Sequence, residues 1–279
     1  MAVAATPLFQ MEASFNESTF YSWLAEHETA PYAASIVYAV SIIAIKQHLE
    51  TRTSYDLRYW LAAWSAALAI FSIMGTVRIG PQLAQAIYTQ GWSATMLDES
   101  YYHAKPTCFW ICLFIASKAV EFGDTLFIVL RKRPLIFLHY YHHISTLLFV
   151  CYLTNERFPP AQFYAILNYG VHSIMYSFYA LKALRVYIPR AVNPVITALQ
   201  AIQMILGMMV TVCFVYLSPD HGKYRTSIQG ALIIYATFFA LFAKFYYENY
   251  VAKRPPRVDS SSNGTTILND ANGSVKKMK

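Results

Sequence analysis

Three histidines stand together at the start of an apolar segment. His139, His142 and His143 occupy positions i, i+3 and i+4, so in a helix all three share one face. An imidazole can act as a nucleophile, a general base or a hydrogen-bond donor. A charged side chain in hydrocarbon costs roughly 2.5–3.5 kcal/mol on insertion scales. Three imidazoles on one stripe therefore predict a polar chamber inside a helical bundle, and we look for the function there.

A second polar cluster lies in the apolar segment before these histidines. Lys118, Glu121 and Thr125 follow i, i+3 and i+7, and Asp124 lies about one turn from Glu121. An unpaired buried charge is strongly unfavourable, so these groups need partners. A purely structural ion pair between Lys118 and Glu121 would satisfy both groups but would leave Asp124 unexplained.

The segment that follows the histidines carries a third cluster. Asn168, His172 and Tyr179 stand at i, i+4 and i+11 on one helix face, with Tyr176 next to it. Taken alone, His172 is more typical of a satisfied core histidine than of a catalytic one. Depth along the helices favours the catalytic interpretation, because all three clusters fall in one layer near the side rich in Lys and Arg.

A fourth polar set lies in the next apolar segment. Thr197, Gln200 and Gln203 recur at three-residue spacing, which suits hydrogen bonds between helices. Without other evidence, the two glutamines would be interpreted as structural.

The composition indicates the elements that must position these groups. The 279 residues are 56% hydrophobic and only 13% charged, which excludes an ordinary soluble domain. Several apolar runs exceed the roughly 20 residues that cross a bilayer. We predict an all-α, polytopic membrane protein with seven transmembrane helices, in which aromatic and aliphatic side chains below the polar layer would line a closed slot for a lipid chain. The helices are expected at 32–50, 58–80, 107–130, 138–154, 161–183, 192–217 and 226–250.

The positive charges predict the orientation of these helices. On one side of the predicted membrane lie fifteen Lys and Arg residues, and on the other side five. The positive-inside rule then places the N-terminus in the lumen and the C-terminus in the cytosol. This distribution also points to topology and anionic ligands rather than to nucleic acid for the net charge of +7. The predicted parts are a luminal tail at 1–31, a helical domain at 32–252 and a disordered cytosolic tail at 253–279.

Two terminal signals agree with this orientation. Asn16 begins an Asn-Glu-Ser glycosylation acceptor on the predicted luminal tail. Lys276 and Lys277 stand third and fourth from the end of the chain, as in dilysine signals that return membrane proteins to the endoplasmic reticulum. The alternative interpretation of the lysines is a basic, solvated terminus.

Together the four polar clusters resemble the signature motifs of the ELO fatty acid elongases. The motifs occur in the family's order and spacing over residues 107–205: Lys118-x-x-Glu121-x-x-Asp124-Thr125, His139-x-x-His142-His143, Asn168-x-x-x-His172-x-x-Met175-Tyr176 with Tyr179, and Thr197-x-x-Gln200-x-x-Gln203. Phe178 stands where the family often has tyrosine. The stretch from Arg133 to His139 is more similar to members that act on saturated and monounsaturated chains.

The resemblance implies a very-long-chain 3-oxoacyl-CoA synthase, an acyltransferase of the endoplasmic reticulum membrane. Such an enzyme condenses a long-chain acyl-CoA with malonyl-CoA and releases carbon dioxide and CoA. Its seven helices would enclose a narrow acyl tunnel, and it would bind no cofactor and no metal. Its partners would be the lipid bilayer and the 3-oxoacyl-CoA reductase, dehydratase and enoyl-CoA reductase of the elongation cycle, and no nucleic acid.

The chemistry of condensation suggests a role for each group. We expect the neutral imidazole of His142 to attack the thioester and form an acyl-imidazole, with Glu121 or Asp124 orienting it. The soluble-ketosynthase scheme with a cysteine nucleophile is unfavoured, because Cys151 lies roughly 12 Å along the helix from His143 at 1.5 Å per residue. His139, His143, His172 and Asn168 would polarise carbonyls and bind the malonyl carboxylate. Further substrate contacts are expected from Thr125, Tyr176, Tyr179, Gln200 and Gln203, and CoA phosphates could meet Lys118, Arg131, Lys132, Arg133, Lys182 and Arg185.

Two other protein classes share part of this pattern. Di-iron membrane desaturases and hydroxylases also carry HxxHH boxes, but they need about eight clustered histidines, and only four of the eight here fall in the polar layer. A seven-helix receptor or retinal protein is suggested by Lys244 in the last helix, although snorkelling to the membrane surface explains that lysine.

Overall fold

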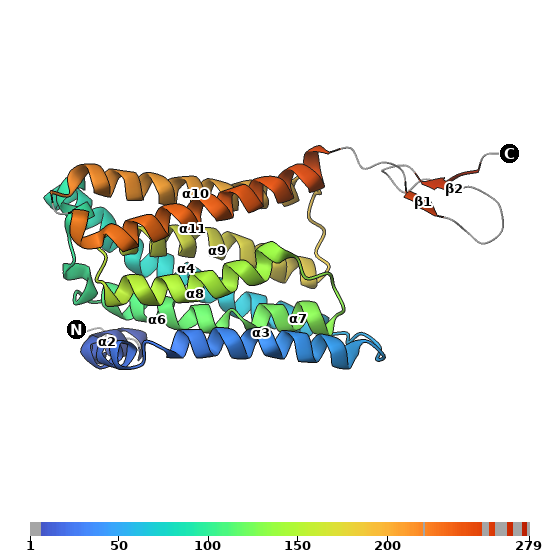
Figure 1. The fold of residues 1–279 in the computed structure, drawn as a ribbon, viewed down its shortest axis with the longest axis horizontal. Helices are drawn as coiled ribbons and strands as arrows, with labels where there is room; N and C mark the ends of the chain where they lie inside the picture. The colour runs from blue at the N-terminus through green and yellow to red at the C-terminus, as the bar shows by residue number, and fades with distance from the viewer. Residues whose placement is uncertain (1–6, 220, 253–256, 260–266, 270–274, 278–279) are drawn as a thin grey trace, which may run out of the picture. The chain divides into compact units, whose positions relative to one another are not determined.

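The computed structural model describes residues 7–219, 221–252, 257–259, 267–269 and 275–277. The chain divides into two compact units, one ending at Phe242 and the other starting at Ala243. The first unit is a bundle whose long helices run lengthwise beside one another (Figure 1). Its main helices are α3 (Ala30–Leu49), α4 (Arg58–Gln90), α6 (Thr107–Val120), α7 (Gly123–Leu130), α8 (Phe137–Asn155), α9 (Ala161–Ala183), α10 (Val192–Leu217) and α11 (Arg225–Tyr246). Its shorter elements are α1 (Pro7–Ser14), α2 (Glu17–Glu26), α5 (Trp92–Leu97) and the 3₁₀ turns η1 (Ser100–Tyr102) and η2 (His221–Tyr224).

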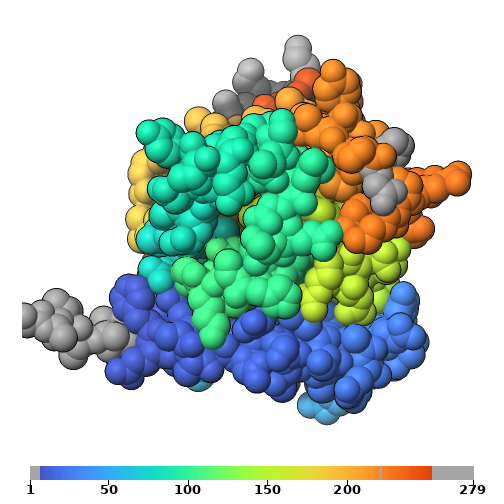
Figure 2. Space-filling view, turned by 90° about the vertical axis from the view of Figure 1, so that its left-hand side faces the viewer, coloured from blue at the N-terminus to red at the C-terminus, as the bar shows by residue number. Residues whose placement is uncertain are grey.

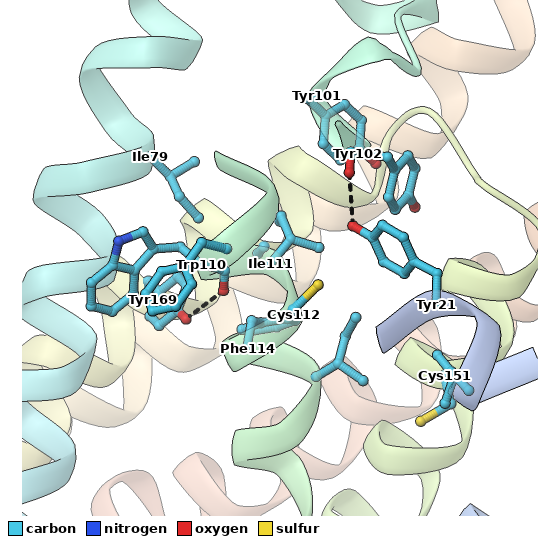
Figure 3. Packing of buried hydrophobic residues seen from close by; sticks show 14 of the residues in the cluster. Tyr21, Ile79, Tyr101, Tyr102, Trp110, Ile111, Cys112, Phe114, Cys151 and Tyr169 are labelled. Atoms are coloured by element: carbon cyan, nitrogen blue, oxygen red, sulfur yellow. Dashed lines mark hydrogen bonds between the residues drawn. The ribbon is translucent and has the colours of Figure 1, made fainter. Parts of the chain in front are cut away.

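Helices α4 and α9 form the most extensive pair in the bundle. Gly75 lets them approach closely, since a Cβ atom at this position would lie 2.5 Å from the ring of Tyr169. Tyr169 is buried, and its hydroxyl donates to the carbonyl oxygen of Trp110 at 3.0 Å, which ties α9 to α6 (Figure 3). Small residues at helix crossings are the usual means of close packing where lipid removes the hydrophobic drive between helices.

Hydrogen bonds join the connections at one end of the bundle, the end at which α2 lies. The hydroxyl of Tyr21 in α2 donates to the carbonyl oxygen of Tyr102 at 3.1 Å. The hydroxyls of Tyr101 and Tyr102 both donate to the carbonyl oxygen of Phe158, between α8 and α9. Tyr224 of η2 bonds to Glu99. The segment from 91 to 106 therefore bonds both to the N-terminal helices and to the turn between α10 and α11. These three parts of the chain lie on the face that Figure 2 shows.

The structure confirms a helical protein with long apolar helices, and it shows further helices in the N-terminal segment. Residues 7–26, predicted as part of a tail, form α1 and α2. Glu12 of α1 is buried because Arg78 donates to both of its oxygens, at 2.8 and 2.5 Å, and Trp110 donates at 2.7 Å. Asn16 caps α2, since its Oδ1 accepts from the backbone amides of Ser18 and Thr19. Its glycosylation stays a prediction.

Two helix boundaries differ from those predicted. Helix α4 runs through Pro81 to Gln90 instead of ending near residue 80. The segment predicted as one helix over 107–130 is split, because α6 ends at Val120 and α7 starts at Gly123. The chain tightens there: the amides of Phe122, Asp124 and Thr125 bond to carbonyls three residues back. Gly123 is required at this place, since a Cβ atom would lie 2.6 Å from the ring of Trp64.

Length and hydropathy alone mark four of the described helices as able to cross a membrane. They are α3, α4, α10 and the stretch Gly222–Val251. The other three predicted spans, α6 with α7, α8 and α9, carry three of the four polar motifs, while the fourth lies on α10. The chain is a multi-pass membrane protein, and the total of seven spans stays a prediction.

The C-terminal unit contains the end of α11, the π-helical turn η3 (Tyr247–Val251) and three short strands. The strands β1 (Arg257–Asp259), β2 (Ile267–Asn269) and β3 (Val275–Lys277) pair antiparallel in the order β1-β2-β3. Leu268 pairs with Val258 on one side and with Lys276 on the other. Most of the tail that we predicted to be disordered lies outside the described residues, so that prediction stays untested.

The close contact of α4 with α9 leads to a stability prediction. Gly75→Ala should push the Tyr169 ring out of position and lower the free energy of unfolding by about 1–3 kcal/mol, as overpacking does. Thermal unfolding in detergent would measure this. Gly170→Ala is the matched control, since a Cβ atom there meets nothing within 4 Å. A Gly75→Ala protein that unfolds at or above the wild-type temperature would contradict the proposed contact.

Candidate active site

Four buried side chains from α6 and α9 form a closed ring of polar contacts. The ammonium of Lys118 donates to Glu121 Oε1 at 2.6 Å and to Asn168 Oδ1 at 2.8 Å. Asn168 Nδ2 lies 3.1 Å from His172 Nε2, and His172 Nδ1 lies 3.8 Å from Glu121 Oε1. The ring satisfies two opposite charges inside the membrane, as a buried ion pair requires. The predicted Lys118–Glu121 pair is therefore present, with Asn168 and His172 as its partners.

This ring also determines which nitrogen of His172 carries the proton. Asn168 accepts from Lys118 with its oxygen, so its Nδ2 is the donor that faces His172. His172 Nε2 must then accept, and the proton of the neutral imidazole sits on Nδ1, toward Glu121. The acceptor nitrogen of His172 is thus engaged by Asn168, and His172 is better suited to hold Asn168 in place than to attack a substrate.

The break between α6 and α7 directs the next motif residue elsewhere. Asp124 accepts from the indole of Trp64 and from the hydroxyl of Tyr176, both at 2.6 Å. These bonds tie α7 to α4 and α9. Thr125, one residue later, exchanges hydrogen bonds with Tyr38 at 2.6 Å and with His139 Nε2 at 2.9 Å. Glu121, Asp124 and Thr125 therefore face three different sets of partners.

The three histidines of α8 pack in series, with the His143 ring 5.4 Å from that of His142. The rings of His139 and His143 lie 4.5 Å apart, and His143 is buried beside His139. His142 is half-buried, and its ring packs 4.9 Å from Phe238 of α11. Among the described residues, neither ring nitrogen of His142 makes a hydrogen bond. The expected bond from Glu121 or Asp124 to His142 is absent, because Glu121 is held by Lys118 and Asp124 by Trp64 and Tyr176.

A cavity of about 650 Å³, counted with its open part, begins at His142. Three motif residues line it: His142, Asn168 and Gln203. The rest of the wall comes from α6, α8, α9, α10 and α11 and is mainly apolar. It includes Ile111, Phe114, Ile115, Phe149, Val150, Leu153, Tyr164, Met204, Ile234, Tyr235 and Phe238. We call this cavity the slot. The wall is mainly apolar, and Thr146 and Thr154 of α8 add hydroxyl groups to the three polar motif residues.

The remaining predicted substrate residues lie outside the slot wall. Gln200 donates to the sulfur of Met175 at 3.0 Å, while Tyr179 is 40% exposed. The loop cations follow α7 and α9. Lys132 donates to the carbonyl oxygen of Glu50 and Lys182 to Asn193, and Arg133 and Arg185 are exposed with Arg131 partly so. These positions suit a charged surface at the end of the bundle where α7 and α9 end.

Three residues that hold this site together were not predicted from the sequence. Trp64, Tyr38 and Phe238 each contact a motif residue, respectively Asp124, Thr125 and His142. All three belong to apolar helices in which aromatic residues are frequent. Spacing within one helix carries no signal for them, since the contacts run between helices far apart in the sequence.

Comparison with known proteins decides the family. The model of the ELO family, described as GNS1/SUR4, matches residues 23–258. The chain is 35% identical over 256 residues to very long chain fatty acid elongase 6 of Gallus gallus, covering 91% of this chain and 96% of that protein. It is 37% identical over 262 residues to elongase 6 of Drosophila melanogaster, covering 90% and 83%. Elongase 3 of Mus musculus is 37% identical over 231 residues, covering 82% and 85%.

The chain belongs to the ELO family. The predicted family is thereby confirmed, and with it an enzyme of fatty acid elongation. The desaturase and receptor alternatives are not favoured. The finer resemblance to members acting on saturated chains stays a prediction.

The ring of buried polar groups leads to a double-mutant prediction. Lys118→Met should leave Glu121 buried without a cation and lower the free energy of unfolding by about 3–5 kcal/mol. Glu121→Gln should be similarly damaging, because it leaves the ammonium without its carboxylate. The double variant should lose clearly less than the sum, since both charges are gone. Unfolding in detergent measures the cycle, and strictly additive losses would show that the two groups do not interact.

Proposed function

We propose that this ELO protein joins a long-chain acyl-CoA to malonyl-CoA, and that His142 carries the acyl group between the two steps. The observation that supports the proposal most directly is the place of His142. It is the histidine of the HxxHH motif that lines the slot, and no described side chain occupies its ring nitrogens. A free, neutral imidazole nitrogen is the nucleophilic form of histidine.

In the first step, His142 attacks the thioester carbonyl of the acyl-CoA. The new nitrogen–carbon bond forms as the carbon–sulfur bond breaks, and the departing CoA thiolate takes up the proton that the imidazole loses. The acyl chain lies along the slot, where apolar side chains replace water around it. The thioester end stays beside His142, Asn168 and Gln203, which are polar.

In the second step, malonyl-CoA loses carbon dioxide and leaves an enolate. The enolate carbon attacks the acyl carbonyl, and the bond to His142 breaks as the departing imidazole nitrogen takes up a proton from solvent, which releases 3-oxoacyl-CoA and the neutral imidazole. Asn168 is well placed to bind a substrate carbonyl or carboxylate, because the ring with Lys118 and His172 holds its amide in one orientation. Holding a donor in place before reaction is the main electrostatic source of catalysis.

The length of the slot suggests which chains fit. Its wall on α8 runs from His142 to Thr154, roughly 18 Å at 1.5 Å per residue. An extended chain covers about 3.5 Å in three bonds, so the slot takes roughly fifteen bonds. Tyr164 stands on the wall near the other end and bonds to Thr211 at 2.7 Å. We therefore expect acyl chains of about 14 to 16 carbons to be preferred over much longer ones.

The remaining assignments concern the cell. We propose that the CoA groups bind at the exposed cations Arg131, Lys132, Arg133, Lys182 and Arg185, on the cytosolic side. The protein would reside in the endoplasmic reticulum, with its N-terminus luminal and its C-terminus cytosolic. It would work with the reductase, dehydratase and enoyl-CoA reductase that complete each cycle, and it would need no bound cofactor. The charge asymmetry of the loops supports the orientation.

The carrier role of His142 predicts a partial reaction. Purified protein given acyl-CoA alone should release about one equivalent of CoA in a burst, and labelled malonyl-CoA added later should yield 3-oxoacyl-CoA. A panel of acyl-CoAs of different lengths in the same assay measures chain preference. His142→Ala should abolish the burst, because it removes the nucleophile.

The control for this experiment is Gly170→Ala, which lies outside the slot and should keep the burst. Turnover that requires both substrates before any CoA appears would reject the acyl-imidazole, while leaving condensation itself in place. Absence of any 3-oxoacyl product from every acyl-CoA tested would reject the condensation.

Retrieval to the endoplasmic reticulum can be tested on the last four residues. Replacing Lys276 and Lys277 by Ser should move the tagged protein toward the Golgi and cell surface, because the dilysine pair would be lost. Microscopy and sensitivity to endoglycosidase measure the shift. Lys279→Ser is the matched control, since it removes one tail charge but keeps the pair. If the double variant keeps the wild-type distribution, Lys276 and Lys277 are not a retrieval signal.

A further inference from the structure

One residue of the slot wall has no place in the four motifs and no partner in the bundle. Four buried side-chain nitrogen or oxygen atoms among the described residues make no hydrogen bond: Arg58 Nε, Thr146 Oγ1, Arg157 Nη1 and Ser227 Oγ. Of their residues, only Thr146 lines the slot. A buried hydroxyl left unbonded costs about 1–3 kcal/mol, so its retention on this wall requires an explanation.

Other hydroxyls in these helices show the usual solution. Ser145, next to Thr146, donates to the carbonyl oxygen of Tyr141 at 2.5 Å, and Thr154 donates to that of Val150 at 2.8 Å. Each thus bonds four residues back along its own helix, as Ser and Thr commonly do inside helices. Thr146 lies between them on α8 and makes no such bond. Its hydroxyl can therefore rotate about χ1 without losing a hydrogen bond.

The position of Thr146 on α8 relates it to His142. The two residues stand at i and i+4, so their Cβ atoms lie about 5–6 Å apart on one face. Cα–Cβ bonds in a helix lean toward the N-terminus, which directs the Thr146 side chain toward His142. Both residues line the slot. An acyl group bound through its carbonyl carbon to His142 would hold its carbonyl oxygen within reach of this hydroxyl.

We infer that the hydroxyl of Thr146 donates a hydrogen bond to the carbonyl oxygen of the acyl group at His142. This inference rests on the proposed carrier role of His142. The same oxygen becomes negative twice, once when His142 displaces CoA and once when the enolate displaces His142. A donor aimed at it lowers both barriers, and a hydroxyl that is free before the substrate arrives can turn to it at no loss. Thr146 is then a catalytic residue outside the family's motifs.

The experiment compares two substitutions at one position. Thr146→Val keeps the shape and removes the donor, so kcat should fall about 100-fold, at the lower end of the range for loss of a single donor. The rate of the CoA burst with acyl-CoA alone should fall by a similar factor, with KM changed less than about threefold. Thr146→Ser restores a hydroxyl and should recover kcat to within about threefold of wild type.

The unfolding temperature separates the two roles of Thr146, because loss of a structural hydroxyl would lower it. Removing an unbonded buried hydroxyl relieves a desolvation penalty, so Thr146→Val should unfold at or above the wild-type temperature while losing activity. Ser145→Ala is the matched control, because that hydroxyl is bonded to its own helix. It should keep kcat and be no more stable than wild type.

The outcomes separate this inference from the proposed function. Wild-type turnover and burst test the function by themselves. If the wild type is active and Thr146→Val keeps kcat and burst rate, the inference is overturned and the function stands. A Thr146→Val protein that loses activity only through a higher KM, or that Thr146→Ser fails to rescue, would likewise reject the hydroxyl as donor. A wild type that makes no product would reject both.

Discussion

A buried ammonium in a membrane helix must be paired within the protein, because the bilayer offers no water to solvate it. In this chain Lys118 meets that requirement through Glu121 on its own helix and Asn168 on α9, and His172 closes the ring. The ring holds α6 against α9 and fixes the amide of Asn168 at the slot wall. Structure and catalysis thus share one network, so weakening the ion pair would also disturb the group that faces the substrate.

The break between α6 and α7 lies next to this ring and divides the motif that runs from Lys118 to Thr125. Gly123 lets the chain pass the ring of Trp64, and the tightened turn rotates the residues that follow. Glu121 stays with the ring, Asp124 is held by Trp64 and Tyr176, and Thr125 pairs with Tyr38 and His139. Asp124 and Thr125 therefore act mainly as ties between helices. That leaves His142 as the motif histidine directed at the slot.

The slot combines a mainly apolar wall with the polar groups of His142, Asn168 and Gln203, an arrangement that suits a thioester with a long chain. Five helices contribute to its wall, so no single helix could reveal it. The bonded connections at the α2 end join Tyr21 to Tyr102 (Figure 3) and Tyr102 to Phe158. A bundle end held by these hydrogen bonds suits a site that must keep an acyl chain bound while one CoA molecule leaves and another binds.

The sequence by itself determined the all-helical membrane class, the family, and most of the residues that would meet in the polar layer. These follow from local information: apolar runs, spacing on one helix face, and four motifs in order. Only the tertiary structure decided which groups pair with which. Asp124 could not be assigned to Trp64, nor Thr125 to Tyr38, because such contacts depend on how separate helices pack. The broken helix at Gly123 and the unbonded hydroxyl of Thr146 were hidden for the same reason, since both are properties of neighbours that spacing along one helix does not record.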